Sequence, residues 1–229
     1  MSNIKQIQLA ELGGVLSTSR RVDEIIFHHT WRPTAADYRG AKTWEAIRRY
    51  HTETRGWSDI GYHFGVGPDG SLWVLRPIGR GGAHCLGHNA HSVGVVLLGN
   101  YDAEDPWANS LSFACEVMAK CCSHYDLKPR QVYFHRDFAN KSCPGLRIER
   151  REVRQLVEKI LAGQTISPTE PDVDEWAQPW VERAIDEGLL TGYPDGTFRG
   201  RRPVTRQELA AALVRLKDRL SLNSRLPDG

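Results

Sequence analysis

The sequence predicts a mixed α/β fold, in which helices flank a central β-sheet, followed by a small C-terminal helical hairpin. Apolar, β-branched runs at 24–29 (EIIFHH) and 92–100 (SVGVVLLGN) have the composition of buried strands. Amphipathic stretches alternate with them, as is typical of an α/β domain. A polar segment with two prolines at 164–172 has the composition of a linker. We therefore expect an α/β domain at 1–163 and a smaller unit at 173–229.

After the first strand, the pattern predicts an amphipathic helix at 43–53. Thr43 is its expected N-cap, and Trp44 and Tyr50 lie on its apolar face. The segment 61–75 (GYHFGVGPDGSLWVL) predicts a hairpin of two strands around Pro-Asp-Gly.

The strand at 92–100 closes with Gly-Asn and is expected at the centre of the sheet. A helix is predicted at 109–127 and a last short strand at 131–135. The domain ends with an amphipathic helix at 147–163, which Gly163 terminates.

The C-terminal unit has the pattern of two helices around a turn. The helices are predicted at 179–188 and 203–220, and the turn at 193–198 (YPDGTF). Thr205 and Glu208 have the spacing of a capping box. The apolar face of the second helix is formed by Leu209, Leu213, Leu216 and Leu220. Because so short a unit buries little core, we expect it to pack on the first domain or on a second copy of the chain, as a homo-oligomer.

The composition indicates a soluble globular protein, with 40% hydrophobic and 25% charged residues. A net charge of +2 is too small to indicate nucleic-acid binding. Residues 1–24 lack the apolar core of a signal peptide, and no apolar run approaches the roughly 20 residues that span a bilayer. We therefore expect synthesis in a cytoplasm, without a signal peptide or a membrane span.

Five cysteines are present, and without a signal peptide a disulfide framework is not expected. Three of them, Cys115, Cys121 and Cys122, fall in an apolar helical pattern and are expected to be buried free thiols. Cys143 differs, because it lies in a loop, directly before Pro-Gly.

The loop FHRDFANKSCPG, residues 134–145, suggests a metal site. His135 and Cys143 are eight positions apart, which is too far for adjacent turns of one helix but suits a loop that doubles back. Catalytic zinc needs three protein ligands and one open position. The third ligand is expected from the end of the first strand, where His28 and His29 point to opposite faces, so that only one of them can bind. A purely structural histidine is the alternative at that position.

Four blocks of the sequence resemble the type-2 N-acetylmuramoyl-L-alanine amidases, a family that includes phage lysozyme-type amidases and animal peptidoglycan recognition proteins. The blocks are EIIFHHT, GWSDIGYHFGVGPDGSLW, GGAHCLGHNAHSVGVVLLGNYD and HRDFANKSCPG, in the family's order over roughly 20–160. Each block alone is a weak signal, but the four together are highly specific.

The resemblance implies the site residues. It makes His28, His135 and Cys143 the ligands of a zinc ion, Tyr62 the residue that orients water and moves its proton, and Lys141 the residue that stabilises the oxyanion. The bond cleaved would join the lactyl group of N-acetylmuramic acid to L-Ala of the stem peptide. Some relatives carry Asp for the cysteine and Glu for the tyrosine, and this chain resembles the Cys/Tyr branch.

The sequence also suggests roles for the other histidines of this region and for one asparagine. His84 and Asn89 either contact the stem peptide in the cleft or are loop residues without a special role. His63 should face away from Tyr62 into the core, and His29 should pack behind the ligands. The remaining three in this region, His51, His88 and His91, are expected to be ordinary polar positions.

The C-terminal unit resembles a surface-layer homology repeat in the stretches GYPDGTF and VTRQE. Such repeats bind secondary polysaccharide of Gram-positive cell walls, and the resemblance makes Arg206 a contact to anionic sugar. Trp180 adds an aromatic surface of the kind that stacks on sugars. The alternative is a helical hairpin that only packs on the first domain.

Together these features predict a zinc-dependent peptidoglycan amidase with a wall-binding module. Without a signal peptide, a phage-type endolysin released through a holin pore is favoured over a secreted autolysin. A non-catalytic peptidoglycan-binding protein on the same fold is the alternative, which loss of Cys143 or Tyr62 would favour. A structural zinc site would need a fourth protein ligand.

Overall fold

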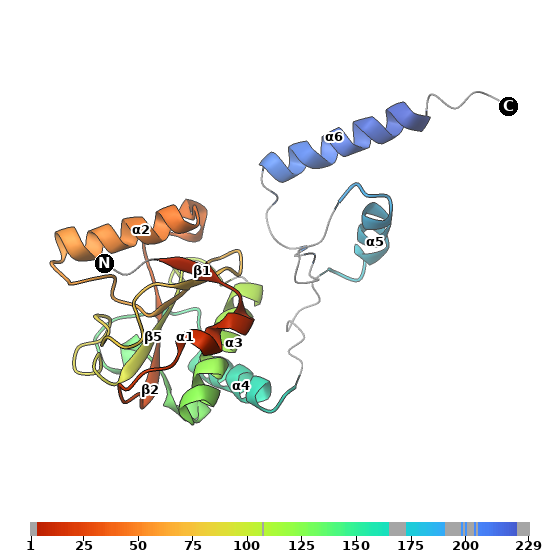
Figure 1. Cartoon of the computed structure of the whole chain (residues 1–229). Helices are drawn as coiled ribbons and strands as arrows, with labels where there is room; N and C mark the ends of the chain where they lie inside the picture. Colours follow the sequence, from red (N-terminus) through yellow and green to blue (C-terminus); the bar gives the residue numbers. More distant parts are fainter. Residues whose placement is uncertain are drawn as a thin grey trace. The chain divides into compact units, whose positions relative to one another are not determined.

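The computed structural model describes residues 4–106, 108–164, 173–190, 198, 200, 204 and 206–223 (Figure 1). The chain divides into two compact units, 1–166 and 167–229. None of the helices in these described ranges is long and apolar enough to cross a bilayer.

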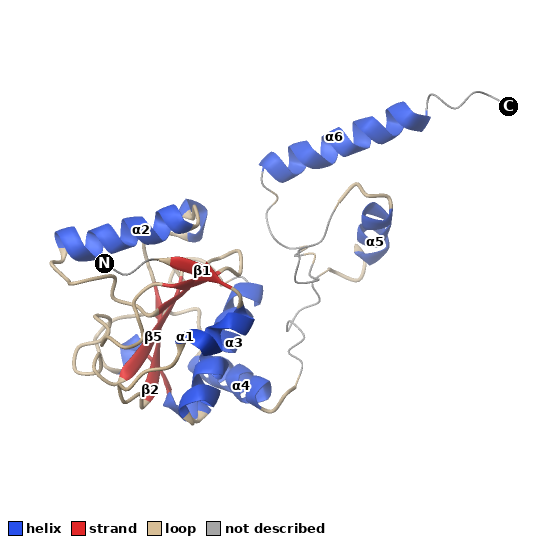
Figure 2. Cartoon of the chain, in the orientation of Figure 1, coloured by secondary structure: helices blue, strands red, loops and turns tan. Residues whose placement is uncertain are grey.

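Among the described residues, six strands form one mixed sheet in the order β1-β4-β3-β5-β2-β6. Figure 2 draws the strands of this sheet in red. Strands β2, β3, β5 and β6 run parallel to one another, and β4 runs antiparallel to β1 and β3. The strands are β1 Lys5–Ile7, β2 Glu24–His29, β3 Phe64–Val66, β4 Leu72–Val74, β5 Ser92–Leu97 and β6 Val132–Phe134. The predicted mixed sheet, with a hairpin made by β3 and β4, is therefore confirmed.

Helices cover both faces of this sheet (Figure 1). On one face lie α1 Leu12–Val15, α3 Ala108–Tyr125 and α4 Arg150–Leu161, and on the other lies α2 Ala41–Arg49. The sequence of strand β5 is continuously apolar because helices cover both faces of the strand. Its residue Val95 packs in the core under α3, whereas its neighbour Val96 packs in the core with Trp44 of α2.

The cysteines of α3 are free thiols, as predicted. Cys115, Cys121 and Cys122 are all buried, and burial raises the pKa of each thiol. The pKa of Cys122 rises to about 12, so these groups behave as small apolar side chains.

Two details of the predicted helix at 43–53 are wrong. Thr43 lies inside α2 and is not its N-cap, and its hydroxyl oxygen accepts a hydrogen bond from the backbone N–H of Arg39 at 2.7 Å. Tyr50 is 52% exposed, although the helical period places it on the apolar face. Helix α2 ends at Arg49, and Tyr50 begins the wider π-helical turn Tyr50–Thr54.

Residues 4–23, for which the sequence predicts no regular element, form β1, a short 3-10 helix and α1. The 3-10 helices of the first unit are η1 Leu9–Glu11, η2 Ala35–Asp37, η4 Pro129–Gln131 and η5 His135–Asp137.

The second unit contains α5 Gln178–Asp186 and α6 Arg206–Asn223, which confirms its helical segments. Leu209, Leu213 and Leu216 of α6 are exposed. The predicted linker beyond Gln164, the turn at 193–197 and the capping box at 205–208 lie outside the residues or side chains that the structure describes.

Candidate metal centre

The register of two parallel strands brings His28 and His135 together. Phe27 of β2 lies opposite Phe134, the last residue of β6, and a histidine follows each of these phenylalanines. The two imidazole rings have centroids 4.7 Å apart. The carboxyl ends of parallel strands meet at one edge of a sheet, which is where ligand sites of α/β folds form.

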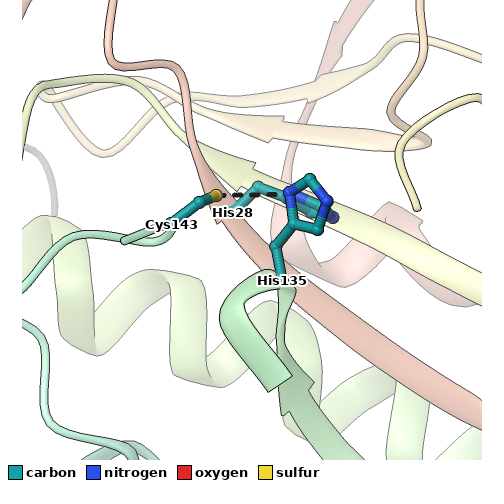
Figure 3. Close-up of side chains that lie close together, drawn as sticks. All are labelled: His28, His135 and Cys143. Carbon is teal, nitrogen blue, oxygen red and sulfur yellow. Dashed lines mark hydrogen bonds between the residues drawn. The ribbon is translucent and has the colours of Figure 1, made fainter. Parts of the chain in front are cut away.

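Cys143 reaches the same point from the loop that follows η5 (Figure 3). Its Sγ atom lies 3.6 Å from Nδ1 of His28. One ligand atom from each of His28, His135 and Cys143 lies within 4.8 Å of the other two. The structure therefore brings together all three residues that the sequence predicts as metal ligands.

The loop that carries Cys143 is held closed by Arg136 and Asp102. The backbone N–H of Arg136 donates to the carbonyl of Cys143 at 2.9 Å, and its guanidinium donates to the carbonyl of Gly145 at 2.6 Å. The carboxylate of Asp102 accepts the hydroxyl of Ser142 at 2.7 Å. The expected doubling back of this loop is therefore held by both backbone and side-chain hydrogen bonds, and the sequence pattern does not reveal these partners.

The electrostatics of the three groups suit a bound cation. Burial lowers the pKa of His28 well below its ordinary value and that of His135 to about 4, so both imidazoles are neutral and can donate a lone pair. Burial raises the pKa of the Cys143 thiol to about 12. A thiolate at this buried position therefore needs a nearby positive charge, which a metal ion supplies.

The donor set fits Zn²⁺ in type and in spacing. Two imidazoles and a thiolate are ligands that zinc prefers, and three protein ligands leave a position open. Tetrahedral bonds of about 2.3 Å to sulfur and about 2.05 Å to nitrogen place those two atoms about 3.6 Å apart. The Sγ to Nδ1 distance has this value without rearrangement.

A chain of hydrogen bonds fixes which nitrogen of His28 faces the metal position. The hydroxyl of Ser92 donates to the carbonyl of His88 at 2.8 Å, so it must accept from Nε2–H of His84 at 3.3 Å. Nδ1 of His84 then accepts from Nε2–H of His28 at 3.1 Å. Nδ1 of His28 is left with a free lone pair on the side of Cys143.

Tyr62 and Lys141 lie close to the three ligands. The partly buried ring of Tyr62 is 5.1 Å from the ring of His28, and burial raises the pKa of its hydroxyl. Lys141 is exposed, and after burial its charge is the next cause that lowers the pKa of His135. A proton-handling hydroxyl and a cation therefore border the predicted metal position.

His84 and Asn89 have structural partners that the sequence does not reveal. His84 is 7% exposed, and its Nδ1 atom lies 3.1 Å from Nε2 of His28. The side-chain oxygen of Asn89 accepts the backbone N–H groups of His84 and Cys85 at 2.8 and 2.9 Å, and so shapes the turn that presents His84. Contact of either residue with a stem peptide stays a prediction.

Two other histidines, His63 and His29, have the structural roles that the sequence predicts. His63 is buried and bonded through both ring nitrogens, to the N–H of Gly94 and the carbonyl of Arg80, which confirms a core role. Nδ1 of His29 accepts the N–H of Tyr101 at 3.2 Å, which confirms that it packs behind the ligands.

His51 is not the ordinary polar position that the sequence suggests. It is buried, and its Nδ1 accepts the N–H of Gly61 at 3.2 Å. Its ring lies 5.8 Å from that of Tyr62, so it supports the tyrosine. The sequence carries no signal for this contact, because it depends on how α2 packs on the sheet.

In the second unit, Trp180 of α5 is 67% exposed and accessible to a ligand. Arg206 begins α6, and its side chain lies outside the described part of the chain.

Comparison with known protein families identifies the first unit. The family described as N-acetylmuramoyl-L-alanine amidase matches residues 18–146. The chain belongs to this family. The matched segment of the amidase family contains His28, Tyr62, His135, Lys141 and Cys143. An S-layer homology domain matches residues 171–210.

Individual relatives agree with this amidase assignment. Human N-acetylmuramoyl-L-alanine amidase is 37% identical over 123 residues, which cover 52% of this chain and 21% of the human protein. The chain thus matches about a fifth of that relative's length. Peptidoglycan-recognition protein SC2 of Drosophila melanogaster is 29% identical over 153 residues, which cover 62% of this chain and 81% of that protein.

Solved structures share the fold of the amidase unit. Drosophila PGRP-LB is 26% identical with a TM-score of 0.50, covering 73% of this chain and 89% of that chain. The endolysin amidase LysCS from Clostridium intestinale is 25% identical with a TM-score of 0.52, covering 64% of this chain and 86% of that chain.

Proposed function

We propose that this protein is a zinc-dependent N-acetylmuramoyl-L-alanine amidase, which hydrolyses the amide bond between N-acetylmuramic acid and L-Ala of the peptidoglycan stem peptide. The observation that carries this proposal is the convergence of His28, His135 and Cys143 within 4.8 Å, from three separate segments of a chain of the amidase family. Three such ligands are the number that a catalytic zinc site uses.

The residues around the metal position have complementary tasks. When bound, zinc supplies the Lewis acidity that polarises the scissile carbonyl and activates water. The hydroxyl of Tyr62, whose burial favours its protonated form, orients the attacking water and passes a proton to the leaving nitrogen. The exposed ammonium of Lys141 stabilises the negative charge that develops on the carbonyl oxygen.

His84 acts through His28, with which it shares a hydrogen bond. By accepting Nε2–H of His28, it holds that ring in the tautomer whose Nδ1 can bind the metal. Ser92 in turn holds the tautomer of His84. We assign His84 as a positioning residue of the site.

The reaction is tested by digestion of purified sacculi followed by mass spectrometry of the released fragments. Free stem peptides that begin with L-Ala are expected. Cys143→Ser should lose both this product and the bound zinc, measured by metal analysis of the purified chain. Full zinc occupancy of Cys143→Ser would contradict the ligand assignment.

The same digestion separates the proposal from its alternative, a non-catalytic peptidoglycan-binding protein on the same fold. That protein would bind sacculi and release no fragment. Retention of Cys143 and Tyr62 at the site supports the enzyme. Similarity to the Clostridium endolysin amidase supports an endolysin, acting on the wall after release through a holin pore.

The second unit is proposed to bind the cell wall. Its match to the S-layer homology domain supports binding of secondary polysaccharide, with Trp180 stacking on a sugar and Arg206 pairing with an anionic group. The exposed leucine face of α6 needs a cover, for which a second copy of the chain in a homo-oligomer is the proposed partner.

A further inference from the structure

A second cluster of metal-binding side chains lies at the other end of β2. Glu24 begins this strand, four residues before His28, so that the two are separated by about 13 Å along it. The carboxylate atom Oε1 of Glu24 lies 2.6 Å from Nδ1 of His88 and 3.3 Å from Nε2 of His91. One ligand atom from each of the three residues lies within 4.8 Å of the other two.

The backbone that carries the two histidines is held in place from several sides. The N–H of His91 donates to the carbonyl of His88 at 3.2 Å, which closes a tight turn. The N–H of Asp23 donates to the carbonyl of His91 at 2.8 Å and ties this turn to the start of β2. The guanidinium of Arg20 donates to the carbonyls of Ala90 and Ser92 at 3.1 and 3.0 Å.

The His88 ring is fixed as well. It stacks on the ring of Phe138, with centroids 3.7 Å apart. A ligand whose ring and backbone are both held loses little conformational freedom when a metal binds.

The carboxylate at the centre of the cluster needs a positive partner. The side chain of Glu24 is 10% exposed, and a buried carboxylate is costly unless it is paired. Among the described residues, the imidazoles of His88 and His91 lie within ion-pair distance of it, and both contact the same oxygen atom. A divalent cation that replaces the two N–H hydrogens would neutralise the carboxylate and leave both imidazoles neutral.

We propose that Glu24, His88 and His91 form a second metal site, which binds a transition-metal dication such as Zn²⁺. Two imidazoles and one carboxylate are a donor set that zinc uses, with the remaining position open to water. Tetrahedral bonds of about 2.05 to 2.1 Å place such ligand atoms about 3.4 Å apart. The Glu24 to His91 distance is already close to this value, and the Glu24 to His88 distance must open by less than one ångström.

This second site would stabilise the turn that supports the first. The carbonyl of His88 accepts the Ser92 hydroxyl at the end of the hydrogen-bond chain from His28. A metal that binds the folded chain only, at one hundred times its dissociation constant, stabilises it by about 2.7 kcal/mol. The site contains no thiolate, so its affinity should be lower than that of the site with Cys143.

The proposal is tested by titrating the full-length, metal-stripped chain with Zn²⁺ in a calorimeter. The parent is expected to bind two ions with different affinities. His91→Asn should weaken the lower-affinity binding at least tenfold and leave the tighter one unchanged. Cys143→Ser should weaken the tighter binding and leave the lower-affinity binding unchanged. His124→Asn, which changes an exposed histidine of α3, is the matched control and should retain both.

Cobalt distinguishes the two sites by spectroscopy. Co²⁺ at the site with Cys143 gives a thiolate charge-transfer band, whereas Co²⁺ bound by Glu24, His88 and His91 gives only ligand-field bands. Glu24→Gln should remove the ligand-field bands of Co²⁺ at the second site. Circular dichroism checks that this variant is folded. One bound ion in the parent, or unchanged affinities in His91→Asn, would overturn the proposal. Neither outcome bears on the amidase reaction, which is assayed separately.

Discussion

Nδ1 of His84 lies 3.1 Å from Nε2 of His28, although the two residues are 56 positions apart in the chain. Ser92 and the carbonyl of His88 complete this chain of hydrogen bonds and set its direction of donation. The geometry at the predicted metal position is therefore controlled by a loop that contributes no ligand to it.

Replacement of His84 tests this control. His84→Leu should lower zinc affinity about 10- to 100-fold, because His28 loses the group that fixes its tautomer. His84→Gln should retain most of the affinity, since its amide oxygen can still accept Nε2–H of His28. Competition with a chromogenic chelator measures both values. Equal affinities in the two variants would contradict the positioning role.

Tyr62→Phe should keep zinc and melting temperature but lose activity on peptidoglycan by about 10²- to 10⁴-fold, because the hydroxyl is the group proposed to handle the proton. Tyr50→Phe removes a hydroxyl from the exposed Tyr50 and is the matched control. If Tyr62→Phe hydrolyses peptidoglycan at the parent rate, Tyr62 only forms part of the cleft wall.

Lys141→Ala should lower kcat more than it changes KM, because the ammonium is proposed to act on charge that exists only in the transition state. Lys128→Ala, which removes another exposed lysine, should change neither constant. Steady-state kinetics on a soluble muropeptide separates the two constants. An effect confined to KM would make Lys141 a substrate-binding residue.

The metal-free protein should lose stability in mild acid. Burial lowers the pKa of His63 to about 3 and that of His51 to about 4, whereas an exposed imidazole has a pKa near 6.5. Below pH 6.5 the unfolded chain therefore binds more protons. The free energy of unfolding should be insensitive to these groups above about pH 7, and should fall between pH 6.5 and 4 by up to about 1.4 kcal/mol per pH unit for each histidine.

Urea unfolding in the presence of a chelator measures this dependence. His51→Gln should have a shallower slope than the parent between pH 6.5 and 4, because one proton fewer is taken up on unfolding. The same slope in both proteins would show that His51 is not held neutral by the fold.

A chain that ends at Gly163 should still hydrolyse small soluble muropeptides, because every proposed ligand and catalytic residue precedes this position. Its binding to walls that retain secondary polysaccharide should be weaker, and Arg206→Ala should reproduce part of that loss. Pull-down on walls and a thermal melt are the two measurements. A large fall in melting temperature with unchanged wall binding would make the second unit a structural support.

Much of this protein is determined by sequence that is read locally. The apolar runs that become β2 and β5 predict buried strands, because a strand covered on both faces has no polar side. The spacing of His135 and Cys143, together with the family resemblance, predicts the three ligands that the structure brings together. Such features can be predicted from the sequence, because they depend only on the periodicity and the type of its residues.

The tertiary structure alone decided the partners of the three proposed ligands. The register of β2 against β6 sets His28 beside His135, and the turn before β5 places His84 behind His28. The same turn carries His88 and His91 to Glu24, where the sequence suggested only ordinary polar positions. These contacts join residues more than 50 positions apart, and hydrogen bonds of 3 Å depend on strand pairing and loop closure, which no local pattern of side chains specifies.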